Sequence, residues 1–225
     1  MDLDRGTIAI YSDIACPWAG AAVHRLRAVR TRVGLDGAVV LDHRPFPLEL
    51  VNQRATPKAE LDAEIPVVGG RLVPDAGWRV WQARASEWPV TTLPALEAVQ
   101  AAKEQGLPVA EALDAALRDA LFAQSRCVSM RHVILEVARR CLEVDADKLA
   151  DALDDGRHRR AVIDAADAAQ RAGVKGSPHL FLPDGSDAHN PGVRMHWVGE
   201  HGQGFPVVDA YDPGVYEDLL RRAAG

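Results

Sequence analysis

The chain of 225 residues is long enough for one large domain or two small ones. Its 26 Lys and Arg residues stand against 32 Asp and Glu residues, so the formal net charge is −6. An acidic balance argues against a general nucleic-acid binder, because neutralising phosphates needs a basic surplus. Hydrophobic residues make up 48% and charged residues 26%, proportions that exclude disordered and collagen-like chains.

Only three cysteines occur, Cys16, Cys127 and Cys141, and no two of them have C-x-x-C or zinc-finger spacing. This excludes a disulfide scaffold, and we expect no bound metal. The start of the chain is acidic, and no apolar run approaches the roughly 18 to 20 residues of a membrane helix. We therefore expect a cytoplasmic protein without a membrane partner, in which the thiols stay reduced.

The first 45 residues predict a β–α–β unit with parallel strands and a right-handed connection. The β-branched run 7–11 predicts a buried strand, apolar residues at helical spacing predict a helix over 21–32, and a second strand follows over 39–44. The segment 45–84 contains five prolines and the pair Gly69-Gly70, and we expect it to be irregular.

From about residue 93 the pattern becomes helical and stays so to about 155. A further helix is predicted over 157–172, strands over 179–182 and 193–198, and a last helix over 213–223. We expect the 199–211 segment to be a loop, because glycine and proline are frequent there.

Neither β-containing end has enough strands to fold alone, so we expect both to share one sheet. The predicted organisation is a split α/β domain over 1–50 and 156–225, with an inserted segment over 51–155 that is helical from about 93.

Two motifs frame this organisation. The first strand runs into Ser12-Asp13-x-x-Cys16-Pro17-Trp18 at the start of a helix, and Gly173-Val174-Lys175-Gly176-Ser177-Pro178 precedes a later strand. Together they resemble the active-site segments of DsbA-like thioredoxin-fold proteins, in particular the FrnE-like cytoplasmic branch with its S-D-x-x-C-P-W-C pattern. The resemblance implies a thioredoxin-like α/β fold with an inserted all-helical domain, and thiol–disulfide oxidoreductase chemistry.

The chain departs from this pattern at Ala19, where the family has its second active-site cysteine. An internal disulfide between positions 16 and 19 is therefore impossible. We expect an enzyme that acts through the single nucleophile Cys16 on a thiol or disulfide substrate, either a small molecule or a protein. A low-molecular-weight thiol would be the co-substrate that resolves the mixed disulfide, and no cofactor is expected to stay bound.

Cys16 is the predicted catalytic residue on physical grounds as well. Free backbone N–H groups and the positive end of a helix dipole favour a thiolate at a helix start. Pro17 begins the helix without losing a needed donor, and the apolar face of Trp18 suits a substrate groove. The plainer interpretation of Cys16 is a small buried hydrophobic residue.

The resemblance implies that Pro178 follows a cis peptide bond and packs against Cys16. The exposed backbone of Ser177 would then pair with an extended substrate, and its hydroxyl would bond that substrate. The alternative for Pro178 is an ordinary trans proline at the start of a strand.

The remaining candidates have mainly structural interpretations. Cys141 shares a helix face with apolar residues, and Cys127 or Cys141 could resolve an adduct on Cys16 only with Cα atoms within about 7 Å. His24 lies about two helical turns from Cys16, too far for a direct base.

We expect Trp78, Trp81 and Trp88 to pack the inserted segment against the thioredoxin-like half, with a lining role in the substrate groove as the alternative. The basic run Arg157, His158, Arg159, Arg160 is interpreted as a solvated helix start, with an anionic partner as the alternative. The spacing of His179, His189, His196 and His201 matches no compact zinc site.

Two other function classes stay open. One is a thiol-dependent transferase or isomerase of the kappa-class glutathione transferase type, or of the related chromene-carboxylate isomerases. These have the same split fold and, near the position of Cys16, a serine. The other is a non-catalytic thioredoxin-fold binding module that retains the groove and has lost the redox cycle.

Overall fold

The computed structural model describes residues 2–225 and contains a four-stranded sheet built from both ends of the chain. Its strands are β1 (Thr7–Ser12), β2 (Val40–Pro45), β3 (His179–Phe181) and β4 (Asp187–His189), in the order β2-β1-β3-β4. β1 and β2 are parallel, whereas β3 pairs antiparallel with both β1 and β4. The prediction that the two β-containing ends share one sheet is confirmed.

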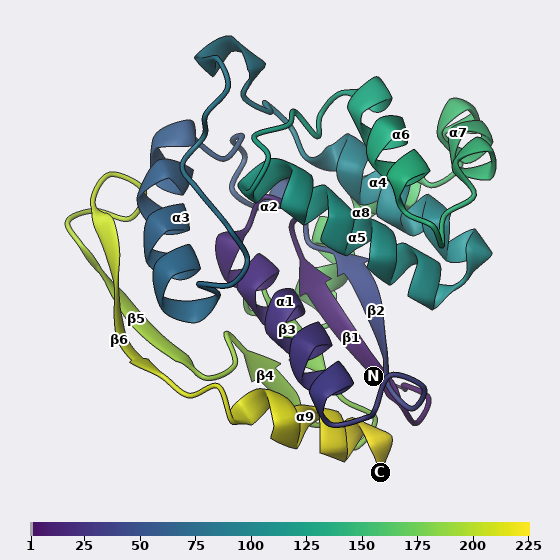
Figure 1. The fold of residues 1–225 in the computed structure, drawn as a ribbon, viewed down its shortest axis with the longest axis vertical. Coiled ribbons are helices and arrows are strands. Elements are labelled where there is room, and N and C mark those ends of the chain that lie inside the picture. The colour runs from purple at the N-terminus through teal and green to yellow at the C-terminus, as the bar shows by residue number, and fades with distance from the viewer. Residues whose placement is uncertain (1) are drawn as a thin grey trace.

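Helices cover both faces of this sheet (Figure 1). Ile8 and Ile10 of β1 face α1 (Pro17–Arg32) and α9 (Val215–Ala224) in one apolar cluster. Tyr11 has the opposite side-chain parity and packs with Ala169 of α8 (Arg159–Arg171). The alternation along β1 thus places α1, which begins at the first motif, against one face of the sheet.

The segment between β2 and α8 is largely helical and covers the upper part of the molecule in the view of Figure 1. A second apolar cluster joins its helices to one another and to Ile14, Ala15 and Val162 outside the segment. Its elements are α2 (Leu48–Val51), α3 (Lys58–Leu72), a 3-10 turn (Ala85–Glu87), α4 (Leu93–Ala102), a 3-10 turn (Lys103–Gln105), α5 (Leu107–Phe122), α6 (Arg131–Arg140) and α7 (Ala146–Asp155).

The prediction of an irregular segment over 45–84, with helix only from about 93, is wrong because α3 lies inside it. Pro66 and the Gly69-Gly70 pair indicate breaks, yet all three lie within the helix. Tertiary packing outweighs these local preferences. The buried positions Leu61, Ile65, Val68 and Leu72 have helical spacing and hold α3 against the body of the protein.

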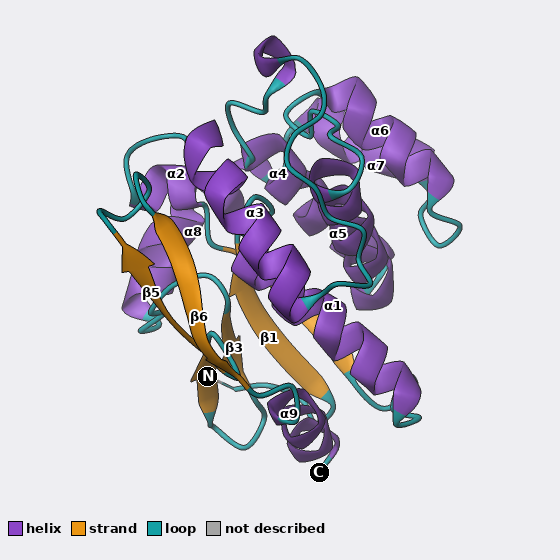
Figure 2. Ribbon diagram, turned by 60° about the vertical axis from the view of Figure 1, so that its left-hand side comes forward, coloured by secondary structure: helices purple, strands orange, loops and turns teal. Residues whose placement is uncertain are grey.

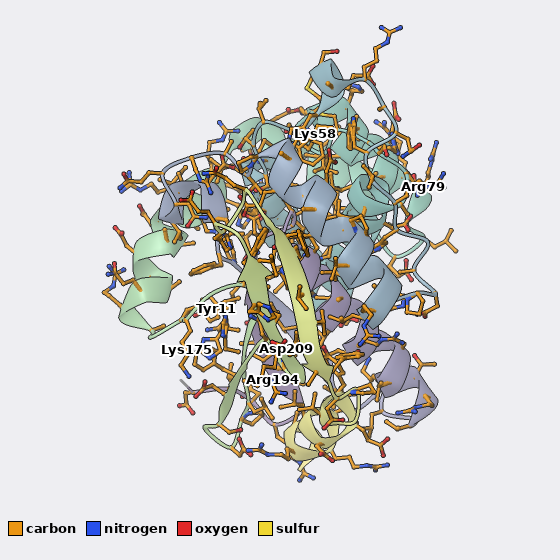
Figure 3. All side chains as sticks on the ribbon, turned by 90° about the vertical axis from the view of Figure 1, so that its left-hand side faces the viewer. Tyr11, Lys58, Arg79, Lys175, Arg194 and Asp209 are labelled. Atoms are coloured by element: carbon orange, nitrogen blue, oxygen red, sulfur yellow. The ribbon has the colours of Figure 1, made fainter. Side chains whose placement is uncertain are left out.

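The prediction of a loop over 199–211 also needs correction. β5 (Val193–Val198) and β6 (Phe205–Tyr211) pair antiparallel in a second, two-stranded sheet, which we call the hairpin. The hairpin lies beside α3 (Figure 2), and in Figure 3 Arg194 and Asp209 mark its two strands. The second strand of the hairpin, β6, was not predicted because Pro206 and the glycines before it are typical of a loop.

The helical segment is joined to the sheet by buried contacts. Glu111 of α5 is 4% exposed and accepts hydrogen bonds from Arg30 Nη1 at 2.8 Å and from the Leu41 amide at 3.2 Å. Trp78 stacks on Phe122 with ring centroids 4.5 Å apart and lies against Gly20 of α1. Trp78 therefore packs the helical segment against the thioredoxin-like half, as we expected of the tryptophans.

Among residues 2–225, the structure has no helix that is long and apolar enough to cross a membrane.

The contact between Gly20 and Trp78 leads to a first prediction. A Cβ atom at position 20 would lie 2.8 Å from the Trp78 ring and 3.0 Å from Phe122, so Gly20→Ala overpacks this contact. We expect Gly20→Ala to lower the free energy of unfolding by about 1 to 3 kcal/mol, measured by denaturant unfolding. The control is Gly70→Ala in α3, where a Cβ meets nothing within 4 Å and helix propensity should raise stability. Equal effects of the two substitutions would contradict the packing argument.

Candidate active site

Cys16 is the N-cap residue of α1, directly after the loop that follows β1. Its backbone is extended (φ −79°, ψ 111°), and Pro17 is the first helical residue, as predicted. The Cys16 sulfur accepts a hydrogen bond from the Ala19 amide at 3.5 Å, in the way that a serine or aspartate caps a helix. The sulfur thus lies at the end of α1 where unpaired amides favour negative charge.

The second motif meets the first at this sulfur, 161 residues away in the chain. The Cys16 thiol donates to the Ser177 carbonyl at 3.1 Å, and the Ser177–Pro178 peptide bond is cis, the isomer that the resemblance implies. The Ser177 hydroxyl oxygen accepts from the Asp13 amide at 3.0 Å. In this structure Ser177 therefore locks the two motifs together, and its bonding to a substrate stays a prediction.

The side chains of this site are buried: Cys16 is 5% exposed, Trp18 8% and Ala19 0%. They share one apolar cluster with Val68 of α3, and the hairpin covers it through Met195 and other side chains. Two elements that the sequence did not predict, α3 and β6, therefore help to enclose the candidate nucleophile.

This enclosure corrects the expectation that the helix start favours a thiolate at Cys16. Burial and, to a smaller extent, the nearby Glu64 carboxylate raise the pKa of Cys16 to about 12. The Ser177 contact and the Ala19 amide act in the opposite direction but do not compensate. In this closed arrangement Cys16 is a protonated hydrogen-bond donor, and thiolate formation requires the site to gain solvent or a partner charge.

Glu64 of α3 is a member of the site that the sequence interpretation missed. Its Oε1 atom accepts from the Trp18 indole Nε1 at 2.8 Å, and the residue is only 6% exposed. Burial and the Glu60 charge raise the pKa of the Glu64 carboxyl to about 7, although the Trp18 hydrogen bond opposes this rise. The helical spacing of the apolar residues in 61–72 was the signal that could have revealed this helix and its inward carboxyl.

Arg118 of α5 fixes the loop between β1 and α1 through hydrogen bonds of its guanidinium. It is 3% exposed, donates to the Asp13 carbonyl at 2.8 Å and to the Ser12 hydroxyl at 2.8 Å, and pairs with Asp114 at 2.7 Å. In the sequence, an aspartate and an arginine four residues apart on a helix are typical of an exposed ion pair. The sequence therefore contains no signal that distinguishes the buried Arg118 from an exposed arginine.

Asp13 closes the same loop from the other side. Its carboxylate accepts from the Ala15 amide and from the Leu48 amide of α2, each at 2.8 Å. Burial raises the pKa of the Asp13 carboxyl, while these amide bonds and the Arg118 charge lower it. The segment from Ser12 to Cys16 is thus fixed by contacts to α2, α5 and the cis-proline loop.

The other sequence candidates lie elsewhere. All three cysteines are free, and Cys141 packs against the helical core rather than in the cluster around Cys16. His24 pairs with Asp75 at 2.9 Å, which agrees with a surface role. His179 is 1% exposed and is held between the Lys175 amide and Asp187, so its partners are structural.

The remaining candidates also contact other parts of the chain. Arg157 and His158 bind Glu104, so the basic helix start finds its anionic partner within the protein. Trp81 and Trp88 form an edge-to-face pair. Across the described residues, 2–225, no group of three or more His, Cys, Asp and Glu side chains is arranged to hold a metal ion.

Comparison with known proteins places the chain in a family. The model of the DSBA-like thioredoxin domain matches residues 7–201, and the chain belongs to this family. This span includes both motifs and the helical segment between them. No curated protein matches the chain.

Solved structures share the fold at low identity. A Nitrosomonas europaea protein assigned as a protein disulfide isomerase is 13% identical, with a TM-score of 0.66 and 97% of each chain covered. The cytosolic disulfide reductase DsbM from Pseudomonas aeruginosa, solved with GSH, is 17% identical, with a TM-score of 0.55 and 97% and 95% covered. A 2-hydroxychromene-2-carboxylate isomerase is 14% identical, with a TM-score of 0.57 and 81% and 87% covered. These similarities show a common fold.

The second prediction concerns the buried ion pair of Arg118. We expect Arg118→Met to lower the free energy of unfolding by about 3 to 5 kcal/mol, because the buried Asp114 carboxylate loses the guanidinium and keeps only His43 at 3.3 Å. The double variant Asp114→Leu with Arg118→Met should recover a large part of this loss. Denaturant unfolding measures both.

The matched control is Arg160→Met, which removes an arginine from an exposed ion pair with Asp164 at the same four-residue separation. We expect no measurable change from it. A similar small effect of Arg118→Met would show that the Arg118 contacts do not stabilise the fold.

Proposed function

We propose that the protein is a thiol–disulfide oxidoreductase that works through Cys16 alone, with an external low-molecular-weight thiol as resolving co-substrate. The observation that carries the proposal is the position of the Cys16 sulfur, which caps α1 and contacts the Ser177 carbonyl beside Pro178. Ala19 contributes a fully buried methyl group in place of a second thiol. We further propose that the protein acts in the cytoplasm, as a FrnE-like member of its family.

The reaction consists of two exchange steps. After a base in solvent removes its proton, the Cys16 thiolate attacks one sulfur of a small disulfide, the S–S bond breaks, and one thiolate leaves. A second small thiolate then attacks the mixed disulfide at the sulfur of the small thiol, the bond to the Cys16 sulfur breaks, and the Cys16 thiolate and a new small disulfide are released. Electrons are only exchanged between thiols and disulfides, so no further oxidant is required.

The burial of Cys16 and Trp18 favours small reactants over folded proteins. A folded substrate would have to displace both α3 and the hairpin, whereas a small disulfide needs room only beside Trp18. Pro17 and Ser177 would complete the contact surface, and the substrate classes we propose remain thiols and disulfides. Nucleic acids and membranes are not proposed as partners.

The third prediction tests the covalent step. We expect incubation with glutathione disulfide to add one glutathione to the intact protein, with peptide mapping placing it on Cys16. Cys16→Ser should remove this adduct. The matched control Cys141→Ser, which alters a cysteine in the helical core, should leave it unchanged.

Addition of a reduced thiol should release the adduct and return the original mass. If no adduct forms on Cys16, or if the adduct persists in Cys16→Ser, the single-cysteine mechanism is wrong.

One observation supports a second candidate, a thiol-dependent transferase or isomerase. As a protonated donor with its pKa raised to about 12, Cys16 is suited to hydrogen-bond the sulfur of a bound small thiol without forming a covalent bond. In that case Cys16→Ser, which retains a donor, should keep thiol binding measured by calorimetry. Binding with no adduct and no turnover would instead indicate the binding module.

A further inference from the structure

Glu64 is the carboxylate built into the wall of the site around Cys16. It projects from α3, and its Oε1 atom is fixed by the Trp18 indole at 2.8 Å. Trp18 is two residues from Cys16 in the first turn of α1, and both belong to the cluster that α3 and the hairpin enclose. With 6% of Glu64 exposed, solvent screens its charge poorly, so a charge there acts strongly on its neighbours.

We propose that Glu64 is a positioning residue for the proposed thiol chemistry: when ionised it suppresses thiolate formation at Cys16, and when protonated it permits it. The inference rests on the proposed function only in giving Cys16 a reaction to perform. The effect of Glu64 on the thiol itself is a property of the folded chain and is measurable with a simple alkylating probe.

The physical basis is repulsion between two negative charges in one poorly hydrated cluster. The Glu64 carboxylate raises the pKa of Cys16, while burial and the Glu60 charge together raise the pKa of Glu64 itself to about 7. Glu64 therefore gains or loses its proton near neutral pH, while the Trp18 hydrogen bond holds the Glu64 side chain in place in both protonation states. The two groups cannot both ionise without mutual cost.

Other charged groups near this pair have partners of their own, but the Glu60 charge also raises the pKa of Glu64. Glu60, one turn earlier on α3, binds Arg54 at 3.2 Å and faces His201 at 4.0 Å. On the hairpin, Asp209 pairs with His196 at 3.0 Å. Further groups on the elements packed against α3 or facing Cys16 are His24, Arg25, Asp75, Arg118, Tyr211 and Asp13.

The test is the rate of Cys16 alkylation by iodoacetamide from pH 5.5 to pH 9, resolved from Cys127 and Cys141 by peptide mass spectrometry. In the wild-type protein the rate should rise tenfold per pH unit at the acid end, flatten near pH 7 as Glu64 ionises, and then rise again. In Glu64→Gln the profile should be a single straight line. The two proteins should agree near pH 5.5, and at pH 8.5 the variant should react about three- to tenfold faster.

The matched control is Glu60→Gln, which neutralises the other buried acid of α3 while leaving the Trp18–Glu64 contact in place. Glu60→Gln should keep the bend but move it to lower pH, because the Glu60 charge contributes to the raised pKa of Glu64. A purely structural role of Glu64 would change the rate by the same factor at every pH and would leave the bend in place.

The proposal is overturned if the wild-type profile has no bend, if Glu64→Gln retains it, or if Glu60→Gln alone removes it. Absence of any Cys16 alkylation in both proteins also overturns it, because Glu64 would then control no accessible thiolate. The wild-type profile needs no variant, so a Glu64→Gln protein that fails to fold does not prevent the test. A bend without a glutathione adduct would support the role of Glu64 while refuting the proposed function, and the reverse result would do the opposite.

Discussion

The site depends on one buried cation, the Arg118 guanidinium. Arg118 reaches from α5 to the backbone carbonyl of Asp13 and to the hydroxyl of Ser12, and it takes its countercharge from Asp114. A buried guanidinium is tolerated only when its donors are paired, so the loop before Cys16 and the helix α5 must form together. The helical segment is for this reason part of the site rather than an appendage to the thioredoxin-like half.

The sequence predicted those features whose physical cause is local. The Cys16-Pro17 step carries its own helix-start chemistry, and the two motifs are short enough to be read directly. Sequence interpretation failed at α3 and β6. Pro66 and Pro206 favour breaks in these two elements, and only long-range packing overrides them. The helical spacing of Leu61, Ile65, Val68 and Leu72, all buried in the structure, is visible in the sequence. The nearby proline and glycine pair nevertheless favour a break.

Arg118 and Glu64 show a different limit of sequence reasoning. Arg118 binds Asp13 across 105 residues, and Glu64 binds Trp18 across 46, so neither contact has a local signature. A charged residue on a helix is usually solvated, and the prior for burial is low. Their functional weight appears only once the fold has brought α3 and α5 against the start of α1.

Two opposing effects meet at Cys16, and their relative size decides how the site behaves. The end of α1 favours a thiolate, as its position in the sequence indicates, but this benefit is modest at a helix terminus. Desolvation by α3 and the hairpin is larger and keeps the thiol protonated in the closed site. The helix start therefore orients the sulfur, while the groups that surround Cys16 set the protonation state of its thiol. The side chains that enclose Cys16 are thus as important for the state of its thiol as its position at the start of α1.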